Sequence, residues 1–540
     1  MRKQIEGNIV DIHHRDIFPG VVSVENGRIV SITRNSKQYD KYILPGFVDA
    51  HVHVESSMLT PMNFSELVIS KGTVAVVNDP HEIANVLGKE GVYFMLDESR
   101  SARIKMFFTI PSCVPATDYD FPGGRLSSDD VGELAKSGRF VGLSEMMNVP
   151  GVLQNQSEPM RKMAIACRYG IPVDGHAPGL TGEDLRKYVR AGISTDHECV
   201  SLDEALEKIN AGMKILIREG SAAKNYEALK SLIASHPDAV MFCTDDAHPG
   251  DILHIGHIDK IVKRAVSDGF DLFDVLKIAC IHPVLHYQLP VGMLRVDDSA
   301  DFIVVKDLKS FEIGSVYIAG EEKYHVGMAF HAERASFASY PNRFSRNFIS
   351  KSELRKAVSQ NNLCIGVKNG EIVTTKESFP AKSALNFQSD TEKDVLKVVY
   401  LNRYRNEQPQ IAFIHGIGLK KGAFATSISH DSHNIIAVGC TDEELTLAIN
   451  AVISEKGGLS VVDEETVSLL PLPIAGIMTD KDGIEVAGIW DEMIEKLHCM
   501  GCCLDSPFMT LSFMALIVIP ELKIGEKGLF EYSSFRFLSE

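Results

Sequence analysis

PGFVDAHVHVESSM (residues 45–58) is the stretch that decides the fold, because an apolar run leads directly into two histidines one residue apart. Residues two apart on a β-strand share a face, so His51 and His53 are expected to point the same way. Neutral imidazole is a common ligand for borderline divalent metals, and two such rings can hold one ion. Taken alone, such a pair is more often a buried, hydrogen-bonded pair without a metal. The segments that follow favour the metal-binding interpretation instead.

Short apolar runs rich in β-formers alternate with segments of helical apolar spacing from residue 43 to about residue 280. This alternation is typical of βα units, which form parallel sheets. Eight such runs fit a closed (β/α)₈ barrel of the TIM-like kind better than an open sheet. The runs cover residues 42–55, 73–80, 103–113, 139–148, 170–178, 192–198, 213–221 and 239–249.

Potentially reactive side chains follow seven of the eight runs. In a parallel barrel the carboxyl ends of the strands meet at one rim, where catalytic groups gather. We therefore expect a metal centre there, with six ligands: His51, His53, Glu145, His176, His197 and Asp245. Glu145 is expected to bridge two ions, and paired ions that share a hydroxide make water a strong nucleophile near neutral pH. Asp245 is expected both to bind a metal and to accept the proton of the metal-bound hydroxide. Its neighbour Asp246 would point the other way if the strand continued. The alternative for this pair of aspartates is a turn or a helix cap.

Composition limits the classes of protein and of partner. The chain has 540 residues, 45% hydrophobic and 24% charged, which suits about two to four globular domains. Its formal net charge of −17 argues against a nucleic-acid or anionic-membrane surface. The beginning of the chain lacks the apolar core of a secretory signal, and FMALIVIP (513–520) is too short to span a membrane. Ten mostly scattered cysteines fit a reducing compartment, so we expect a soluble cytoplasmic protein.

The segments on both sides of the predicted barrel have a different pattern. GVVSVENGRIVSI (20–32) alternates apolar and polar residues around an Asn-Gly turn, as a β-hairpin does, and residues 300–320 are similar. One small β-sandwich domain is therefore expected beside the barrel, and a further α/β domain after it. The expected divisions are residues 1–42 with 290–335 for the small β-domain, 43–289 for the barrel and 340–540 for the C-terminal α/β domain.

Two other clusters contain metal-binding residue types. SHDSHN (429–434) either closes over the barrel mouth as part of the pocket or is a polar loop, and the second interpretation is favoured. HVE (53–55) with HCMGCC (498–503) superficially matches the H-x-E and P-C-x-x-C signature of another class of zinc deaminases. His498 stands where that signature has proline, and four barrel residues would be left without a role. A separate structural zinc at HCMGCC lacks an evident fourth ligand.

Longer stretches carry a family resemblance. HVHVESSMLTP, NDPHEIANVLG, VGLSEMMNVPGV, DGHAPGL, STDHE, MKILIREGSA and CTDDAHP resemble the metal-dependent amidohydrolase superfamily and, within it, the bacterial-type adenine deaminases. The resemblance continues at residues 415–439 and 506–531, so it covers nearly the whole chain. Glu145 stands where the superfamily usually has a bridging lysine. One departure is ACIHPVLHYQL (279–289), which replaces the family's usual T-x-N-P-A version.

The resemblance implies hydrolytic deamination of adenine to hypoxanthine and ammonia by a metal-bound hydroxide in a binuclear barrel site. It implies that the six expected ligands match the family's ligands and that Asp245 matches its proton shuttle. Two divalent ions per subunit are expected, Mn²⁺ or Fe²⁺, with Zn²⁺ compatible with the same nitrogen and oxygen ligands. Adenine and water are the expected partners, without nucleic acid or membrane, and a homodimer is expected.

Further residues lie in the ESS, PHE and REGS motifs. Glu55 and Glu82 are expected to be catalytic, and crowding of acids at the rim would let one of them stay protonated and donate to a ring nitrogen. For Glu55 the alternative is a carboxylate that only orients a histidine. Expected substrate contacts are Ser56, His81, Arg218 and Glu219, with a structural ion pair as the alternative for the last two.

Two other functions remain open at this point. One is an amidohydrolase acting on another aminopurine or on a cyclic amide, because pocket shape cannot be read from sequence. The other is a nonenzymatic metal-binding scaffold, which would predict the loss of at least one ligand. All six ligands are present, which favours the enzyme.

Overall fold

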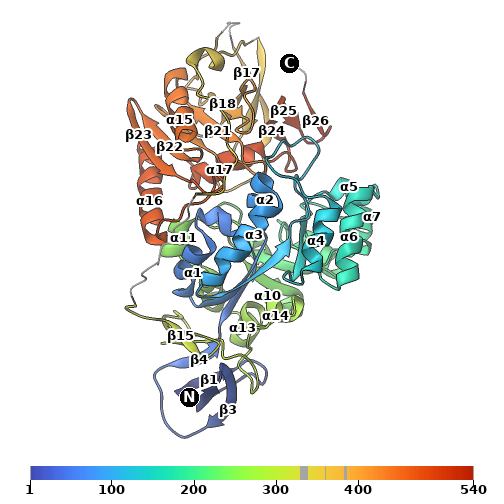
Figure 1. The fold of residues 1–540 in the computed structure, drawn as a ribbon, viewed down its shortest axis with the longest axis vertical. Helices are drawn as coiled ribbons and strands as arrows, with labels where there is room; N and C mark the ends of the chain where they lie inside the picture. Colours follow the sequence, from blue (N-terminus) through green and yellow to red (C-terminus); the bar gives the residue numbers. More distant parts are fainter. Residues whose placement is uncertain (1, 329–338, 359, 382–385, 539–540) are drawn as a thin grey trace.

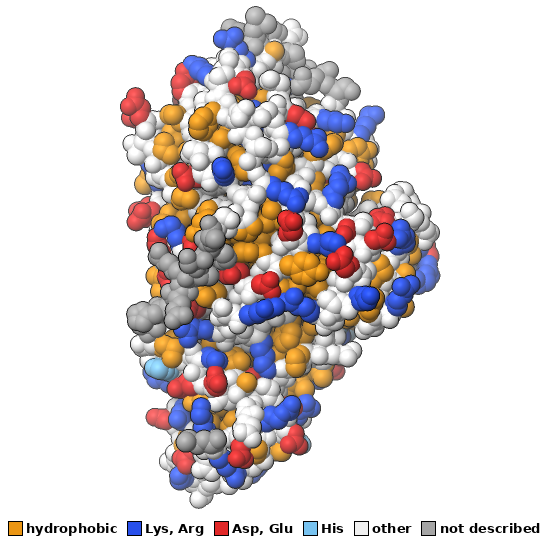
Figure 2. Space-filling view, viewed as in Figure 1, with side chains coloured by type: hydrophobic (Ala, Val, Ile, Leu, Met, Phe, Trp, Pro, Cys, Tyr) orange, Lys and Arg blue, Asp and Glu red, His pale blue; other side chains and the backbone are white. Residues whose placement is uncertain are grey.

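The computed structural model describes residues 2–328, 339–358, 360–381 and 386–538. The chain begins in a β-sheet at one end of the molecule, continues through a ring of strands and helices in the middle, and ends in an α/β region at the other end (Figure 1). Positive and negative side chains are mixed over the face seen in Figure 2. Within the described ranges, no helix has both the length and the apolar character that crossing a membrane requires.

Eight short parallel strands form the central ring in the order of the chain. Five make one hydrogen-bonded sheet, β5-β6-β7-β8-β9, and three make another, β10-β11-β12. Parallel bridges from Val173 to Ile193 and from Val52 to Asp245 join the two sheets, so the ring closes. The expectation of a TIM-like barrel is confirmed, and every strand lies within one of the eight predicted runs. The strands are β5 (Phe47–Val52), β6 (Thr73–Asn78), β7 (Lys105–Ile110), β8 (Gly142–Met146), β9 (Val173–Gly175), β10 (Thr195–Asp196), β11 (Lys214–Arg218) and β12 (Val240–Cys243).

Helices lie between successive barrel strands and cover the outside of the ring (Figure 1). α7 shows how they pack: Leu185 and Tyr188, three residues apart, form its buried face. The Tyr188 hydroxyl donates to the Met146 carbonyl at 2.7 Å and accepts from the His176 amide at 3.2 Å, which fixes the ends of two strands. The helices are α1 (Pro61–Ile69), α2 (His81–Leu87), α3 (Lys89–Glu98), α4 (Ser128–Lys136), α5 (Val149–Leu153), α6 (Ser157–Tyr169), α7 (Gly182–Arg190), α8 (Leu202–Asn210), α9 (Tyr226–Leu229), α10 (Leu232–Ser235), α11 (Pro249–His254), α12 (Ile258–Ser267), α13 (Leu272–Cys280) and α14 (His282–His286).

The sheet at the N-terminal end takes strands from both sides of the barrel. β4 pairs in parallel with β1 and antiparallel with β13. Asn26 and Gly27 have φ of 49° and 78°, the left-handed values that a tight hairpin turn between β2 and β3 requires. All seven strands belong to one sheet, so the expected two-layer sandwich is not confirmed, and residues 329–335 of that segment lie outside the described residues. The strands are β1 (Lys3–Asp11), β2 (Asp16–Glu25), β3 (Arg28–Arg34), β4 (Tyr42–Pro45), β13 (Phe302–Val305), β14 (Ile313–Ile318) and β15 (Glu321–His325).

The C-terminal region contains an eight-stranded sheet in the order β17-β16-β19-β18-β21-β20-β22-β23 and a three-stranded sheet, β24-β25-β26. It reaches the barrel at Leu59, which forms a bridge with Thr479. The strands are β16 (Asn361–Gly366), β17 (Thr375–Pro380), β18 (Leu396–Leu401), β19 (Gln410–His415), β20 (Ala423–Thr426), β21 (Ile435–Gly439), β22 (Gly458–Asp463), β23 (Thr466–Pro471), β24 (Leu522–Gly525), β25 (Gly528–Glu531) and β26 (Arg536–Phe537). The helices are α15 (Asp442–Ser454), α16 (Gly483–Cys499) and α17 (Pro507–Ser512).

Candidate metal centre

The carboxyl ends of the barrel strands bring six buried side chains to one rim. Each of them lies in a strand or within two residues of its end, where the parallel ring converges. All six are more than nine-tenths buried. They are the six expected ligands: His51, His53, Glu145, His176, His197 and Asp245.

Glu145, in β8, lies between two pairs of histidines. Its Oε1 is 3.3 Å from His53 Nε2 and 3.9 Å from His51 Nε2. Its Oε2 is 2.7 Å from His176 Nδ1 and 3.3 Å from His197 Nε2. Burial would raise the pKa of Glu145, but these histidines, led by His176, hold it well below its usual range. The carboxylate is therefore ionised and presents one oxygen to each pair.

Asp245 completes the set on the side of His51 and His53. Strand β12 ends at Cys243, and Asp245 has a left-handed backbone with φ of 58°. Its amide donates to the His51 carbonyl at 3.0 Å, and its carbonyl accepts from the His53 amide at 3.0 Å. Its Oδ1 lies 3.4 Å from His51 Nε2 and 3.1 Å from His53 Nε2. Because the strand has ended, Asp246 also lines the cavity, contrary to the expectation that it would point away.

This donor set fits a divalent cation. Metal–ligand bonds of about 2.1 Å at tetrahedral angles place neighbouring ligand atoms about 3.4 Å apart, and the separations here range from 2.7 to 3.9 Å. Nε2 of His51, the nitrogen that faces Glu145 and Asp245, is buried without a hydrogen-bond partner. His53 Nδ1 donates to the Asp79 carbonyl at 3.0 Å, which leaves the lone pair of Nε2 free for a metal.

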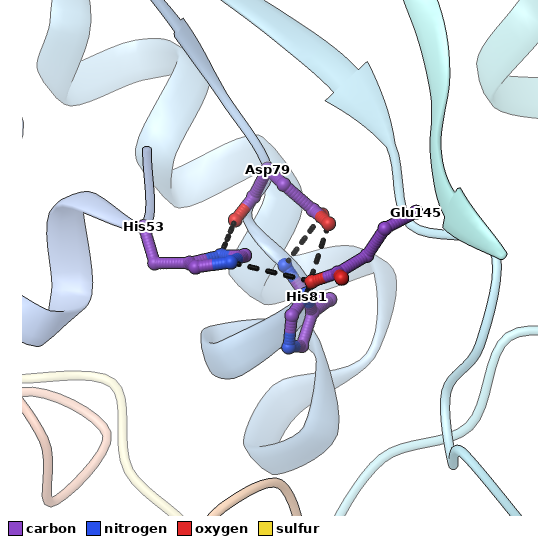
Figure 3. A group of neighbouring side chains, drawn as sticks. All are labelled: His53, Asp79, His81 and Glu145. Carbon is purple, nitrogen blue, oxygen red and sulfur yellow. Dashed lines mark hydrogen bonds and ion pairs between the residues drawn. The ribbon is translucent and has the colours of Figure 1, made fainter. Parts of the chain in front are cut away.

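Asp79 and His81 form the wall beside Glu145 (Figure 3). Asp79 follows β6, and its Oδ2 lies 2.9 Å from His81 Nδ1. The His81 ring and the Glu145 carboxylate point toward one another in Figure 3, with 3.6 Å between Nδ1 and Oε1. His81 therefore stands at the cluster, and its role as a substrate contact stays a prediction.

The two expected acids, Glu55 and Glu82, differ in position and ionisation. Glu82 lines the cavity in front of the cluster. Burial would raise its pKa, but three histidines, led by His430, hold it well below its usual range. Glu55 lies behind, in a 3₁₀ turn (Val54–Ser57), where its Oε1 accepts from the Ile83 amide at 3.3 Å. Burial raises the pKa of Glu55 to about 8, so Glu55 is the protonated acid of the two near neutral pH.

Of the other expected contacts, Arg218 reaches the site and Glu219 turns away. Arg218 forms an ion pair with Glu198 and donates from Nη1 to Asp245 Oδ2 at 2.8 Å. Glu219 instead pairs with Arg264, with 3.3 Å between Oε2 and Nη1, and is not among the described residues that line the cavity.

Ser56 supports the rim through Asp246. Its Oγ donates to Asp246 Oδ1 at 2.5 Å, while its carbonyl lies 3.2 Å from His248 Nδ1. These bonds connect the segment after β5 with the segment after β12. As with His81, its predicted contact with substrate stays a prediction.

Four ionisable residues of the cavity wall were not predicted as site residues: Glu198, Asp246, His430 and Asp431. Glu198 directly follows a predicted ligand, and its position after a strand was the available signal. His430 and Asp431 belong to SHDSHN, so the structure supports the pocket interpretation of that loop, which the sequence had not favoured. The loop comes from the C-terminal region, and its approach to the barrel depends on tertiary structure.

Two cavities meet at this rim. The first, of about 30 Å³, lies among the clustered side chains and is also lined by C-terminal apolar residues that include Phe513, Leu516 and Ile519. The second, of about 770 Å³, is lined by the loops after β7, β8 and β9 and by the C-terminal residues Val518, Tyr532 and Phe535. Met147 and His176 line both, so the larger cavity adjoins the cluster.

The side chains of HCMGCC do not share one environment. His498 donates from Nε2 to the Leu504 carbonyl at 2.9 Å. Cys499 and Cys503 are exposed, whereas Cys502 is buried. The barrel rim is therefore the better-formed candidate for a metal.

Comparisons with known proteins place this barrel in the amidohydrolase class: the model of the amidohydrolase family matches residues 42–323. The model of the adenine deaminase C-terminal domain matches residues 371–536. Adenine deaminases of Methanosarcina acetivorans, Sulfurovum sp. and Parabacteroides distasonis are 48%, 47% and 46% identical to this chain. Each alignment covers 99% of this chain and 98–99% of the relative. The chain belongs to the adenine deaminase family.

Proposed function

We propose that the protein hydrolyses adenine to hypoxanthine and ammonia. The observation that carries this proposal is the Glu145 carboxylate between two histidine pairs, because it provides two adjoining sets of metal ligands. The full-length similarity to proteins named adenine deaminase supports the choice of substrate.

Two ligand sets would hold two divalent ions. The first consists of His51, His53 and Asp245 with Oε1 of Glu145, and the second of His176 and His197 with Oε2. Nitrogen and oxygen donors of this kind suit Mn²⁺, Fe²⁺ and Zn²⁺, and we favour Mn²⁺ or Fe²⁺. A divalent ion, when bound, lowers the pKa of water and so supplies a nucleophile near neutral pH.

The purine would reach the cluster through the larger cavity. The space of about 30 Å³ at the cluster holds on the order of one or two water molecules, too little for a purine. The adjoining space of about 770 Å³ is large enough, and it meets the cluster at Met147 and His176. The ring would therefore bind at this junction, with C6 directed toward Glu145 and Asp245.

Asp245 would transfer the proton from water to the amino group of adenine. The water oxygen bonds to C6, Asp245 takes the proton from water and gives it to the amino group, and the C6–N bond breaks to release ammonia. The Arg218 bond to Oδ2 leaves Oδ1 directed into the cluster, where the proton is transferred. Glu82 would contact the ring as a carboxylate, and Glu55 would support α2 through the Ile83 amide.

The division of the chain also belongs to the proposal. We propose a small β-domain from residues 1–42 and 290–335, a barrel from 43–289 and an α/β domain from 340–540. The one sheet that contains both β1–β3 and β13–β15 supports the first of these. The homodimer and the cytoplasmic location stay predictions.

A substrate panel tests the proposed activity. Protein loaded separately with Mn²⁺, Fe²⁺ or Zn²⁺ is mixed with adenine, other aminopurines and cyclic amides, and ammonia release or ring opening is followed. We expect ammonia from adenine above all other substrates. Hydrolysis of a cyclic amide without turnover of adenine would favour the alternative amidohydrolase function.

A further inference from the structure

The loop SHDSHN (residues 429–434) is polar yet buried. It connects β20 and β21, and all six of its residues are more than nine-tenths buried. Loops normally run over the surface, because buried backbone and polar side chains need partners. The buried polar side chains of this loop therefore need hydrogen-bonding or charged partners within the protein.

Its main partner is Glu82 of the barrel. His430 Nδ1 lies 2.7 Å from Glu82 Oε1, and His433 Nε2 contacts Glu82 Oε2. Each oxygen of this carboxylate thus faces one imidazole from a segment about 350 residues further along the chain. Glu82 is itself only 2% exposed, so the histidines replace the water that would otherwise solvate its charge.

The loop is fixed on its other side by the C-terminal sheet. His433 donates its amide to the Ser429 carbonyl at 2.7 Å, and Ser429 Oγ donates to the Asn434 carbonyl at 2.9 Å. Asn434 Nδ2 in turn donates to the Tyr400 hydroxyl at 2.7 Å. These bonds set the loop conformation, so both imidazoles are presented in fixed positions.

The ring of His430 is also locked by stacking. It lies parallel to Phe513, with 4.8 Å between ring centroids and 14° between ring planes. Phe513 lines the same small cavity as Glu82. One face of the His430 ring therefore packs on Phe513, while its Nδ1 contacts the Glu82 carboxylate.

We propose that His430 and His433 are positioning residues that hold Glu82 as an oriented, hydrogen-bond-accepting carboxylate, so that the C-terminal region completes the active site. This inference rests on the proposed function, in which Glu82 contacts the purine. A carboxylate held by the His430 hydrogen bond and the His433 contact accepts a hydrogen bond from an N–H of the base. It does not act as the acid that the sequence analysis considered for this position.

Paired substitutions test the proposal. His430→Asn keeps a donor near Nδ1 and His433→Gln keeps one near Nε2, whereas His430→Leu and His433→Leu remove the donor. We expect the Leu variants to lower kcat for adenine about 10–100-fold, as loss of an outer partner of a site residue usually does. The Asn and Gln variants should recover most of that loss. His415→Leu, at an exposed histidine of the same region, is the matched control.

The double-mutant series separates positioning from general structural damage. In the Glu82→Gln background, His433→Leu should cause little further loss, because the group it positions is already changed. The inference would be overturned if the kcat losses of Glu82→Gln and His433→Leu multiplied in the double mutant. It would also be overturned if a Leu variant lost bound metal together with activity. If the wild type fails to deaminate adenine with any metal, the proposed function itself is wrong. Thermal unfolding of each variant identifies any that do not fold, and the Asn and Gln variants then carry the test.

Discussion

Arg218 donates from Nη1 to Asp245 Oδ2 at 2.8 Å, and the same guanidinium pairs with Glu198. One buried cation therefore fixes two carboxylates of the candidate site. Both carboxylates are more than nine-tenths buried, so solvent cannot take over this role. The expected consequence is that Asp245 loses its orientation when Arg218 is replaced.

Arg218→Gln should lower kcat for adenine about 10–100-fold, because losing the partner of a metal ligand usually costs this much in activity or metal affinity. Initial rates and bound metal, measured on the same preparation, check the prediction. Arg264→Gln is the matched control, since Arg264 is half-exposed and pairs with Glu219 outside the cavity. Unchanged kcat and metal content in Arg218→Gln would show that Asp245 needs no such partner.

Met147 lies where the two cavities meet, and it is 5% exposed. Met147→Trp should raise KM for adenine severalfold, because the larger side chain narrows the passage to the cluster. Bound metal should stay unchanged, since Met147 is not an expected ligand. Gln154→Trp, in the wall of the larger cavity only, is the control. If both substitutions change KM equally, the junction is not where the purine passes.

Lys523 provides a pH test of burial in the C-terminal region. It is fully buried, and its Nζ donates to the Ile372 carbonyl at 2.7 Å. Burial lowers the pKa of Lys523 to about 7, whereas an unfolded lysine has a pKa of about 10.4. Between these values the unfolded chain binds more protons. The lysine therefore makes the free energy of unfolding rise with pH, by up to about 1.4 kcal/mol per pH unit.

Lys523→Met should remove this rise. Below pH 7 the lysine is protonated in both the folded and the unfolded state, so it does not make the free energy of unfolding depend on pH. The difference in that free energy between wild type and variant should therefore change only as pH increases from about 7 to 10. Urea unfolding at pH 6, 7.5 and 9 measures it. Lys527→Met, at an exposed lysine, is the control. Parallel pH dependences of wild type and Lys523→Met would show that the amine is charged in the folded state.

The barrel and its ligands could be predicted because the signals are local. Strands buried on both faces form continuous apolar runs, and each ligand lies in or within two residues of such a run. Arg218 is the last residue of β11 and lines the cavity, whereas Glu219 follows the strand end and pairs with Arg264 instead.

Other features depend on tertiary structure. Asp246 enters the cavity because Asp245 adopts a left-handed backbone after β12, which breaks the alternation assumed for that pair. His430 meets Glu82 across 348 positions of sequence, and no local periodicity reports such a contact. The cavity sizes and the apolar cover over the rim likewise follow from packing between the barrel and the C-terminal region.

The central claim is that Glu145 joins two metal-binding sets that together hydrolyse adenine. Titration of metal-free protein with Mn²⁺, followed by adenine consumption and by calorimetry of metal binding, tests it most directly. We expect no turnover without metal, a plateau at two equivalents per chain, and loss of both binding and turnover in Glu145→Gln. Turnover of adenine by the metal-free protein, or unchanged binding and turnover in Glu145→Gln, would contradict the claim.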